Sequence, residues 1–501
     1  MSPAPASSNL VRAAGGLAAV RLGVRLLGVA VGLVVSRLLG PEGLGCLTIP
    51  NLVLVTAPFL TLGLPDALVR ELPLAGRESG LDRRLVQTSW HLTGLISLLL
   101  VCVAWLSRGA LGAWFADTWL LCLSLASGLC NVAYKVSYSE FIGRQRFADL
   151  ARLQLLQGAL RAALVLALLF ALPAGAQVYA LHAGVSLSLL GSLVWAARRG
   201  GVTWPRYDRR AAGLLWRSGP PMALAALFLT LLVVGDRLVM SRVLPLPALG
   251  IYEQGVLIRD GLLLLPAVLL TVLIPDYAAR QGDPAQRAAV LADVSRQMGL
   301  VAVGTPVLLG LALLQLPWLF ALLLPRFLPG LPLFQLTVAA MGPVFLSYIP
   351  VSLLMSEGRA GRVGLLAAAC LGAMVAADLA GPPAALEGWL AGVLPGPVMA
   401  GLPRALWGVL AALACFWTYT LAILALSRRR HGFPWRRIAG WLAPTLALGL
   451  AVTAALGAGA LRRWDPWTNG AALVAALLLL AGYQRRTGQL TKVWRARHAP
   501  S

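Results

Sequence analysis

Charged side chains are scarce in this sequence: they make up 12% of its 501 residues, whereas hydrophobic residues make up 59%. A soluble domain of this length needs more charge to cover its surface, so the scarcity excludes an ordinary soluble protein. The apolar runs show no period-two alternation, and backbone groups in lipid must be satisfied internally, so these runs are expected to be helices. The composition therefore predicts an all-α polytopic membrane protein.

Acidic residues are scarcer still, with 19 Asp and Glu against 42 Lys and Arg, which gives a formal net charge of +23. In a soluble protein such an excess would suggest nucleic-acid binding. Here the basic residues lie mainly in loops between apolar runs, where they would face anionic lipid headgroups. Membrane lipids are therefore expected partners, and nucleic acid is not.

Cysteine and histidine are few and scattered. The six cysteines lie in or beside apolar runs and form no CxxC pair, which is typical of packing residues and not of disulfides or metal ligands. The four histidines lie far apart in the sequence. Neither a metal site nor a cofactor is expected.

Long hydrophobic segments are abundant, and each of them can cross a bilayer at roughly 20 residues per span. An irregular Pro- and Gly-rich stretch, 381–401, is predicted to hold a short interfacial helix at 386–394. The sequence predicts fourteen transmembrane spans: 14–38, 44–65, 86–107, 113–138, 152–172, 176–198, 213–240, 248–275, 297–324, 331–355, 362–381, 402–427, 437–460 and 468–484.

One stretch occurs twice. Ser36–Gly45 precedes an apolar run that ends at Leu64-Pro65-Asp66, and Ser241–Gly250 precedes a second run that ends at Ile274-Pro275-Asp276. In each copy a Ser-Arg pair closes one helix, and Pro-Asp is expected to stop the next helix before an Arg-bearing loop. A recurrence of this length predicts two parallel halves and a transporter with its site between them.

The repeat also predicts the domain organisation. Residues 1–199 form an N-terminal lobe of six spans, and residues 218–430 form a C-terminal lobe of six. A basic cytoplasmic linker, 200–217, joins the lobes, while residues 431–501 hold two further spans and a basic cytoplasmic tail.

The distribution of arginines predicts the orientation. Most of them follow even-numbered spans or lie in the C-terminal tail. By the positive-inside rule both termini are cytoplasmic, which predicts a multi-pass protein of the cytoplasmic (inner) membrane. The arginines after odd-numbered spans are Arg37, Arg108, Arg242, Arg326, Arg404, Arg462 and Arg463.

Charges inside spans are costly in lipid and are therefore functional candidates. Arg21 and Arg25 are four residues apart, so they share one face of the first helix. The remaining candidates are Lys135, Arg161, Asp236, Arg237, Glu253, Arg259 and Asp260.

Several candidates have a structural alternative. Arg21 could extend to the cytoplasmic surface, and Arg259 could form an internal ion pair with Asp260 or another acid. The Asp236-Arg237 pair could be structural, at the membrane boundary. Lys135 could bridge to a nearby acid, Glu140, or reach a headgroup.

An excess of arginines over acids within the spans favours an anionic ligand. The guanidinium group stays protonated and pairs bidentately with phosphate oxygens, so a lipid diphosphate fits well, although composition alone would allow any anion. The acids available for ion coupling are Asp260, Glu253 and Asp236, with no clear cation site.

The opening motif resembles a known family. Arg37–Gly45, followed by Leu62-Gly63-Leu64 and Ala67–Arg70, is similar to the start of the bacterial polysaccharide and oligosaccharide flippases. These flippases belong to the multidrug/oligosaccharidyl-lipid/polysaccharide exporter superfamily. The second-half pattern of the family resembles Gly219-Pro220, Asp236-Arg237-Leu238, Leu249–Tyr252 and Ile274-Pro275.

The resemblance implies two six-helix lobes that form a V and work by alternating access. The implied cargo is an undecaprenyl-diphosphate-linked oligosaccharide for cell-surface polysaccharide synthesis, and the implied partners are glycosyltransferases and a polymerase of the same pathway. In related lipid II flippases, arginines on the first and eighth helices engage the diphosphate. That role is carried here to Arg21, Arg25 and Arg259 as an expectation.

Three alternatives stay open. Related lipid II flippases carry a cavity arginine on the second helix, and this chain has none between Leu44 and Leu64, which favours another glycan. A drug/cation antiporter of the superfamily would prefer acids in its cavity. A membrane glycosyltransferase or ligase would need a large outer loop with catalytic residues, so an enzyme is not expected.

Overall fold

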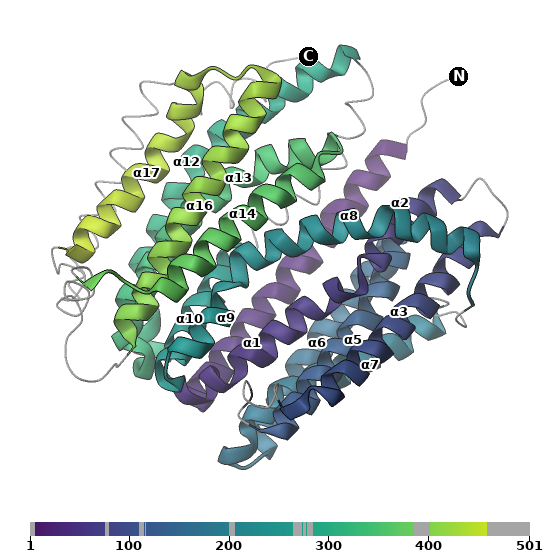
Figure 1. Ribbon diagram of the computed structural model, residues 1–501, viewed down its shortest axis with the longest axis horizontal. Coiled ribbons are helices and arrows are strands. Elements are labelled where there is room, and N and C mark those ends of the chain that lie inside the picture. Colours follow the sequence, from purple (N-terminus) through teal and green to yellow (C-terminus); the bar gives the residue numbers. More distant parts are fainter. Residues whose placement is uncertain are drawn as a thin grey trace. The chain divides into compact units, whose positions relative to one another are not determined.

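The protein is described here from a computed structural model, which describes residues 6–75, 80–109, 115, 117–199, 206–263, 273, 277, 284–384 and 401–457. All regular elements in these residues are helices (Figure 1). Contacts between Cα atoms divide the chain into two compact units, Met1–Ser241 (unit 1) and Arg242–Ser501 (unit 2).

The helices of unit 1 are α1 (Ala6–Thr56), α2 (Leu64–Ala75), α3 (Leu81–Leu106), α5 (Thr118–Gly143), α6 (Phe147–Ala171), α7 (Gln177–Arg198) and α8 (Arg209–Val234), with the 3-10 turns η1 (Ala57–Thr61) and η2 (Ala174–Ala176). The short helix α9 (Asp236–Val243) crosses into unit 2. Unit 2 continues with α10 (Leu246–Leu262), α12 (Pro284–Leu323), η3 (Pro325–Gly330), α13 (Leu331–Ser356), α14 (Ala360–Ala380), α16 (Leu402–His431) and α17 (Trp435–Gly457).

Ten helices of the described residues are long and apolar enough to cross a membrane. The chain is therefore a multi-pass membrane protein, as its composition predicts. The predicted span at 468–484 and the predicted interfacial helix at 386–394 lie outside the described residues. Of the eighth predicted span, 248–275, the structure describes mainly the part within α10, a helix of 17 residues.

The first two predicted spans are joined by a sharp bend at the predicted turn. Within α1, Gly40 has non-helical backbone angles (φ 66°, ψ −173°), and Pro41 follows it directly. Glycine adopts a positive φ at little cost, and proline suits the first turn of the helix that follows. The Gly-Pro dipeptide therefore separates two helices, as expected from the motif.

The first Pro-Asp pair, Pro65-Asp66, does not stop a helix, so the prediction was wrong for this copy, while the second pair, Pro275-Asp276, lies outside the described residues. The break comes earlier, at Leu62 (φ 54°) and Gly63 (φ 70°), after which Leu64 begins α2. Proline is tolerated in the first turn of a helix, and an acid there interacts favourably with the helix dipole. Pro65-Asp66 thus forms the start of α2, which also holds Arg70.

Small and apolar side chains hold unit 1 together. α6 packs against α1 and α7, and α5 packs against α1, α2 and α7. One buried cluster in this unit combines α1, α5, α6 and α7 through residues such as Val31, Leu47 and Val165. This packing brings α1, α5 and α6, the helices with most of the candidate cations, next to one another.

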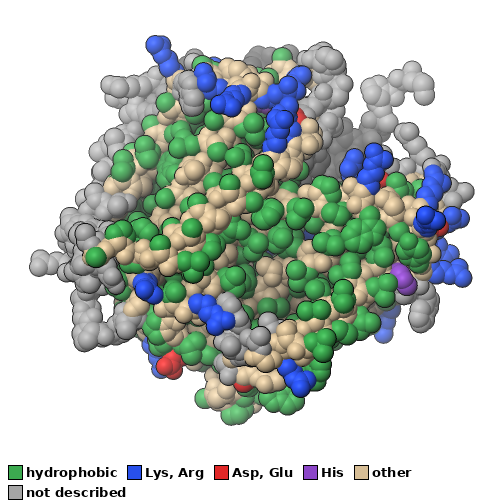
Figure 2. All heavy atoms as spheres, viewed as in Figure 1, with side chains coloured by type: hydrophobic (Ala, Val, Ile, Leu, Met, Phe, Trp, Pro, Cys, Tyr) green, Lys and Arg blue, Asp and Glu red, His purple; other side chains and the backbone are tan. Residues whose placement is uncertain are grey.

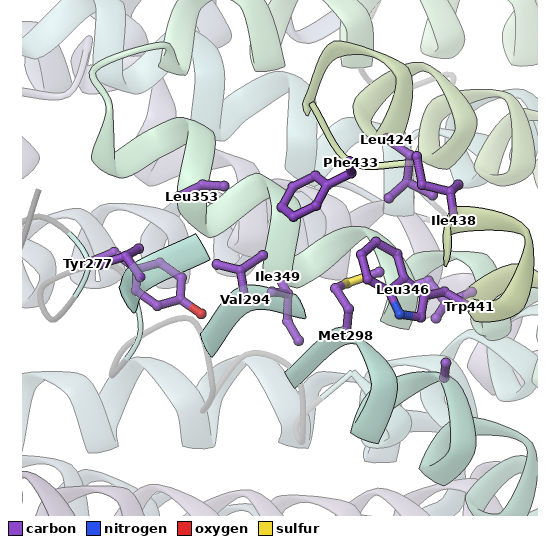
Figure 3. Close-up of a cluster of buried hydrophobic side chains, with 12 residues drawn as sticks. Tyr277, Val294, Met298, Leu346, Ile349, Leu353, Leu424, Phe433, Ile438 and Trp441 are labelled. Carbon is purple, nitrogen blue, oxygen red and sulfur yellow. The ribbon is translucent and has the colours of Figure 1, made fainter. Parts of the chain in front are cut away.

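The centre of unit 2 is α13, most of whose residues are buried. α10, α12, α14, α16 and α17 all pack against it. A helix that is apolar on every side is typically enclosed by other helices, as here. Figure 3 shows part of this core, where Phe433 and Trp441 meet edge to face, with ring centroids 5.8 Å apart, beside Leu346 and Met298.

Large hydrophobic side chains remain exposed on outward helix faces. On α3, Leu98 and Leu99 are 61% and 62% exposed, and Leu106 is 84% exposed. Hydrophobic side chains cover much of the visible surface, with Lys and Arg near its edges (Figure 2). Such apolar faces suit contact with lipid chains.

Candidate functional site

Two cations of unit 1 meet around one tyrosine. Arg21 of α1 donates a hydrogen bond to the hydroxyl of Tyr138 on α5, and its guanidinium carbon lies 5.9 Å from the centre of that ring. The Lys135 Nζ lies 5.8 Å from the same ring centre. All three side chains are half-buried. Cation–π attraction lets an aromatic ring hold two positive charges near one place.

Lys135 also makes an ion pair, with Asp66 and not with Glu140. Its Nζ lies 2.9 Å from Asp66 Oδ1, and the side chains are 32% and 25% exposed. Glu140 instead contacts Arg144, with 3.2 Å between Oε1 and Nε. Lys135 therefore links α5 to the first turn of α2.

The position of Asp66 depends on a close contact between two backbones. A Cβ atom on Gly63 would lie 2.4 Å from the carbonyl oxygen of Gly219 in α8. Gly63 also has a positive φ of 70°, which glycine adopts at little cost. The close contact and the backbone conformation therefore both require glycine at this position. α8 thus packs directly on the break that precedes α2. This contact fixes where α2 begins and therefore where Asp66 lies.

A second group of basic side chains lies on the adjoining helices α1 and α6. Arg25 is exposed and Arg161 is half-buried, and the two are close enough to repel each other electrostatically. Neither has a carboxylate within ion-pair distance among the described residues. Two such arginines in membrane helices form a site that an anion would stabilise.

His182 of α7 lies within electrostatic range of Arg161. The imidazole is fully buried, and its Nδ1 lies 3.0 Å from the Ser127 hydroxyl of α5. Its Nε2 has no hydrogen-bond partner in the described part of the chain.

The candidates of unit 2 lie on α10. Arg259 and Glu253 are buried, with 3% and 6% exposure, whereas Asp260 is half-buried and within electrostatic range of Tyr348 on α13. An arginine this buried needs nearby acids or acceptors to offset its desolvation. α10 itself carries two acids around its arginine.

Asp236 and Arg237 lie at the start of α9 and are both buried. The backbone N–H of Arg237 donates to Asp236 Oδ1 over 2.9 Å. This contact is local, between adjacent residues. The ion-coupling or pairing roles of Asp236, Arg237, Glu253 and Asp260 stay predictions.

Three residues of this region were not identified as site candidates from the sequence. Asp66 was interpreted as part of a helix stop and His182 as one of four scattered histidines, and Tyr138 was not singled out. A signal for Tyr138 does exist, because it follows Lys135 by three residues and so shares its helix face. The contacts of Asp66 and His182 depend on how the helices pack.

Residues 34–325, more than half of the chain, match the protein family described as polysaccharide biosynthesis protein. The chain belongs to this family. The matched region contains the opening motif and the second-half motif, so the resemblance seen in those residues is confirmed. No curated protein matches the sequence.

Solved structures with a similar fold are membrane transporters. One is the lipid II flippase MurJ in an inward closed conformation, with a TM-score of 0.63, 12% identity, and coverage of 94% of this chain and 99% of that one. Another is a MOP superfamily transporter from Pyrococcus furiosus, with a TM-score of 0.59, 13% identity, and coverage of 84% and 95%.

An inward-facing multidrug resistance MATE transporter of the MOP superfamily is also similar, with a TM-score of 0.56, 14% identity, and coverage of 82% and 98%. At these identities the likeness establishes the fold. This polysaccharide biosynthesis family member therefore has an all-helical fold like that of MOP superfamily transporters.

Proposed function

We propose that the protein is a flippase that moves an undecaprenyl-diphosphate-linked oligosaccharide across the cytoplasmic membrane for cell-surface polysaccharide synthesis. The single observation that carries the proposal is the group of cations in unit 1 that lack carboxylate partners among the described residues, Arg25 and Arg161 above all. Such a site favours an anionic cargo over a cationic drug.

The remaining parts of the proposal follow from the positive-inside pattern and the family resemblance. Both termini lie in the cytoplasm, so Arg21 and Arg25 lie toward the cytoplasmic half of the first helix, where they would meet the diphosphate before it is flipped. Arg259 of α10 is proposed as a further contact of the diphosphate. The two lobes predicted from the repeat open alternately to either side of the membrane, driven by an ion gradient or the membrane potential.

Lipid II is a second candidate cargo, supported by the fold likeness to the lipid II flippase MurJ. The second predicted span of this chain, 44–65, lacks an arginine of the kind expected in that flippase. We therefore favour a different glycan on the same lipid diphosphate.

The test is a flipping assay in proteoliposomes with a fluorescent undecaprenyl-diphosphate oligosaccharide. We expect Arg25→Ala and Arg259→Ala to lose flipping, measured per amount of folded and inserted protein because loss of the buried Arg259 also lowers stability. Arg152→Ala is a matched control, because Arg152 is exposed on α6 and pairs with Asp149 at 3.7 Å, away from the candidate cations. Unchanged flipping in both test variants would make these arginines structural, and no flipping of any polyprenyl-linked glycan would favour a drug antiporter.

A further inference from the structure

The ion pair between Asp66 and Lys135 holds a carboxylate against one cation of the candidate anion site. It places a carboxylate on a lysine that shares the Tyr138 ring with Arg21. A carboxylate and a phosphate oxygen make the same kind of charge-assisted contact to an ammonium group. Asp66 therefore occupies a position where a phosphate of the cargo could equally bind.

We propose that Asp66 is a built-in counterion that neutralises Lys135 until the diphosphate of the cargo displaces it. Lys135, Arg21 and the Tyr138 hydroxyl then form one side of the headgroup site in unit 1. This inference rests on the proposed function, because it assumes a diphosphate cargo. In this proposal Lys135 binds the cargo, and Asp66 competes with the cargo for Lys135.

The pair is weak enough to be exchanged. Both partners are about a quarter to a third exposed, and an ion pair of this kind is worth about 1 kcal/mol or less. A diphosphate carries more charge than one carboxylate and can contact Lys135 and Arg21 together. The exchange therefore favours the cargo when it is present.

Released Asp66 retains a favourable environment. It lies in the first turn of α2, where unpaired backbone N–H groups and the helix dipole stabilise a negative charge. The Gly63–Gly219 backbone contact fixes this turn independently of the ion pair. α2 can thus keep its position when Lys135 changes partner.

The alternative is that the pair is only a clamp between α2 and α5. The two roles predict opposite effects of Asp66→Asn. A clamp predicts weaker ligand binding because the helix is less well held, whereas a competing counterion predicts tighter binding because Lys135 becomes available.

The experiment titrates the purified protein with farnesyl diphosphate, a short isoprenoid diphosphate, and measures the Kd by calorimetry. We expect Asp66→Asn to lower the Kd about fivefold, the upper range for a partly exposed ion pair. Lys135→Ala should raise the Kd, and adding Asp66→Asn to Lys135→Ala should give no further change, because the competitor has lost its target.

Two controls accompany the titration. Asp149→Asn removes the carboxylate of another unit 1 ion pair, with 2.7 Å between Arg146 and Asp149, and should leave the Kd unchanged. Farnesol has the same tail without phosphates, and Asp66→Asn should not alter its binding. Thermal denaturation of each variant checks the fold.

The outcomes separate the two proposals. If wild type binds and Asp66→Asn binds equally or more weakly, the counterion role is overturned while the diphosphate cargo stands. If neither wild type nor Asp66→Asn binds farnesyl diphosphate, the proposed cargo and the counterion role fail together.

Discussion

Unit 1 and unit 2 differ in how their helices accommodate positive charge. In unit 1, Arg25 and Arg161 repel each other electrostatically, and neither has a carboxylate at ion-pair distance within the described residues. In unit 2, buried Arg259 shares α10 with Glu253 and Asp260. Arg25 and Arg161 therefore fit the proposal of an anionic cargo, whereas the buried arginine of unit 2 has acids on its own helix.

Charge at the helix ends is compensated in both units, in unit 1 for example by Arg146 and Asp149. Glu357, after the end of α13, lies 3.5 Å from Arg359, 3.9 Å from Arg430 and 3.4 Å from His431. One carboxylate there joins the α13–α14 turn to the end of α16. The positive charge at these helix ends is thus balanced by a carboxylate of the fold itself.

The largest expected effect is on stability, from Arg259→Met. Removing one member of a buried charged group leaves the others unbalanced, at a cost of about 3–5 kcal/mol. We expect a clear fall in the thermal denaturation temperature of the purified protein. If Arg259→Met is as stable as wild type, Arg259 is not compensated by nearby acids. Unit 2 would then not differ from unit 1 in this respect.

A somewhat smaller loss is expected from Gly63→Ala. The substitution forces a side chain into a positive φ of 70° and against the Gly219 carbonyl oxygen, 2.4 Å from the new Cβ. Backbone strain of this kind costs about 1–3 kcal/mol. Thermal denaturation should detect it. Gly213→Ala in α8 is the matched control, since a Cβ there meets nothing within 4 Å.

Asp117→Ala tests a carboxylate of unit 1 that does have partners. Asp117 caps α5, accepting a hydrogen bond from the Leu120 N–H over 2.8 Å and another from the Tyr179 hydroxyl. Burial acts to raise the pKa of Asp117, but these hydrogen bonds lower it by more, so its net pKa is below the usual value of 3.8. Loss of a helix cap costs about 1 kcal/mol.

The pH dependence of this effect has a definite sign. Because the folded-state pKa is lowered, the stabilisation by Asp117 is fully present above pH 3.8 and is lost as the pH falls through the lower folded-state value. The difference in denaturation temperature between wild type and Asp117→Ala should therefore shrink below pH 3.8. A difference that grows with acidity would contradict the assigned hydrogen bonds.

The smallest effect on stability is expected from Arg161→Met. Since Arg161 is repelled by Arg25 and lacks a carboxylate partner among the described residues, its removal relieves repulsion and should leave the denaturation temperature equal to or slightly above that of wild type. Flipping should nevertheless fall. A marked loss of stability in Arg161→Met would place this arginine in the same class as Arg259.

Local features of the fold could be predicted from the sequence, and contacts between distant helices could not. The Gly40-Pro41 bend follows from the conformational preferences of two adjacent residues. Pro65-Asp66 was misjudged because proline and aspartate are compatible with the start of a helix as well as with its end. The segment before them contains the actual break, at a leucine and a glycine with positive φ.

The candidate site was harder to predict than the local bends, because it depends on how helices distant in the sequence pack together. Arg21, Arg25, Lys135 and Arg161 could be selected because charge inside a span is costly. The grouping of these residues could not be predicted. Lys135 pairs with Asp66, which is 69 positions away in the sequence, and Arg25 comes near Arg161 only because α1 packs on α6. The nearest acid in the sequence, Glu140, was the wrong partner for Lys135.

The most direct test of the central claim is the affinity of the Arg25→Met/Arg161→Met double variant for farnesyl diphosphate, measured beside its thermal denaturation. The account predicts a fold as stable as wild type and a Kd raised at least about 30-fold, since charge-assisted hydrogen bonds are worth about 1.5–3 kcal/mol each. Wild-type affinity in a stable double variant would contradict the claim that the uncompensated cations of unit 1 bind the diphosphate.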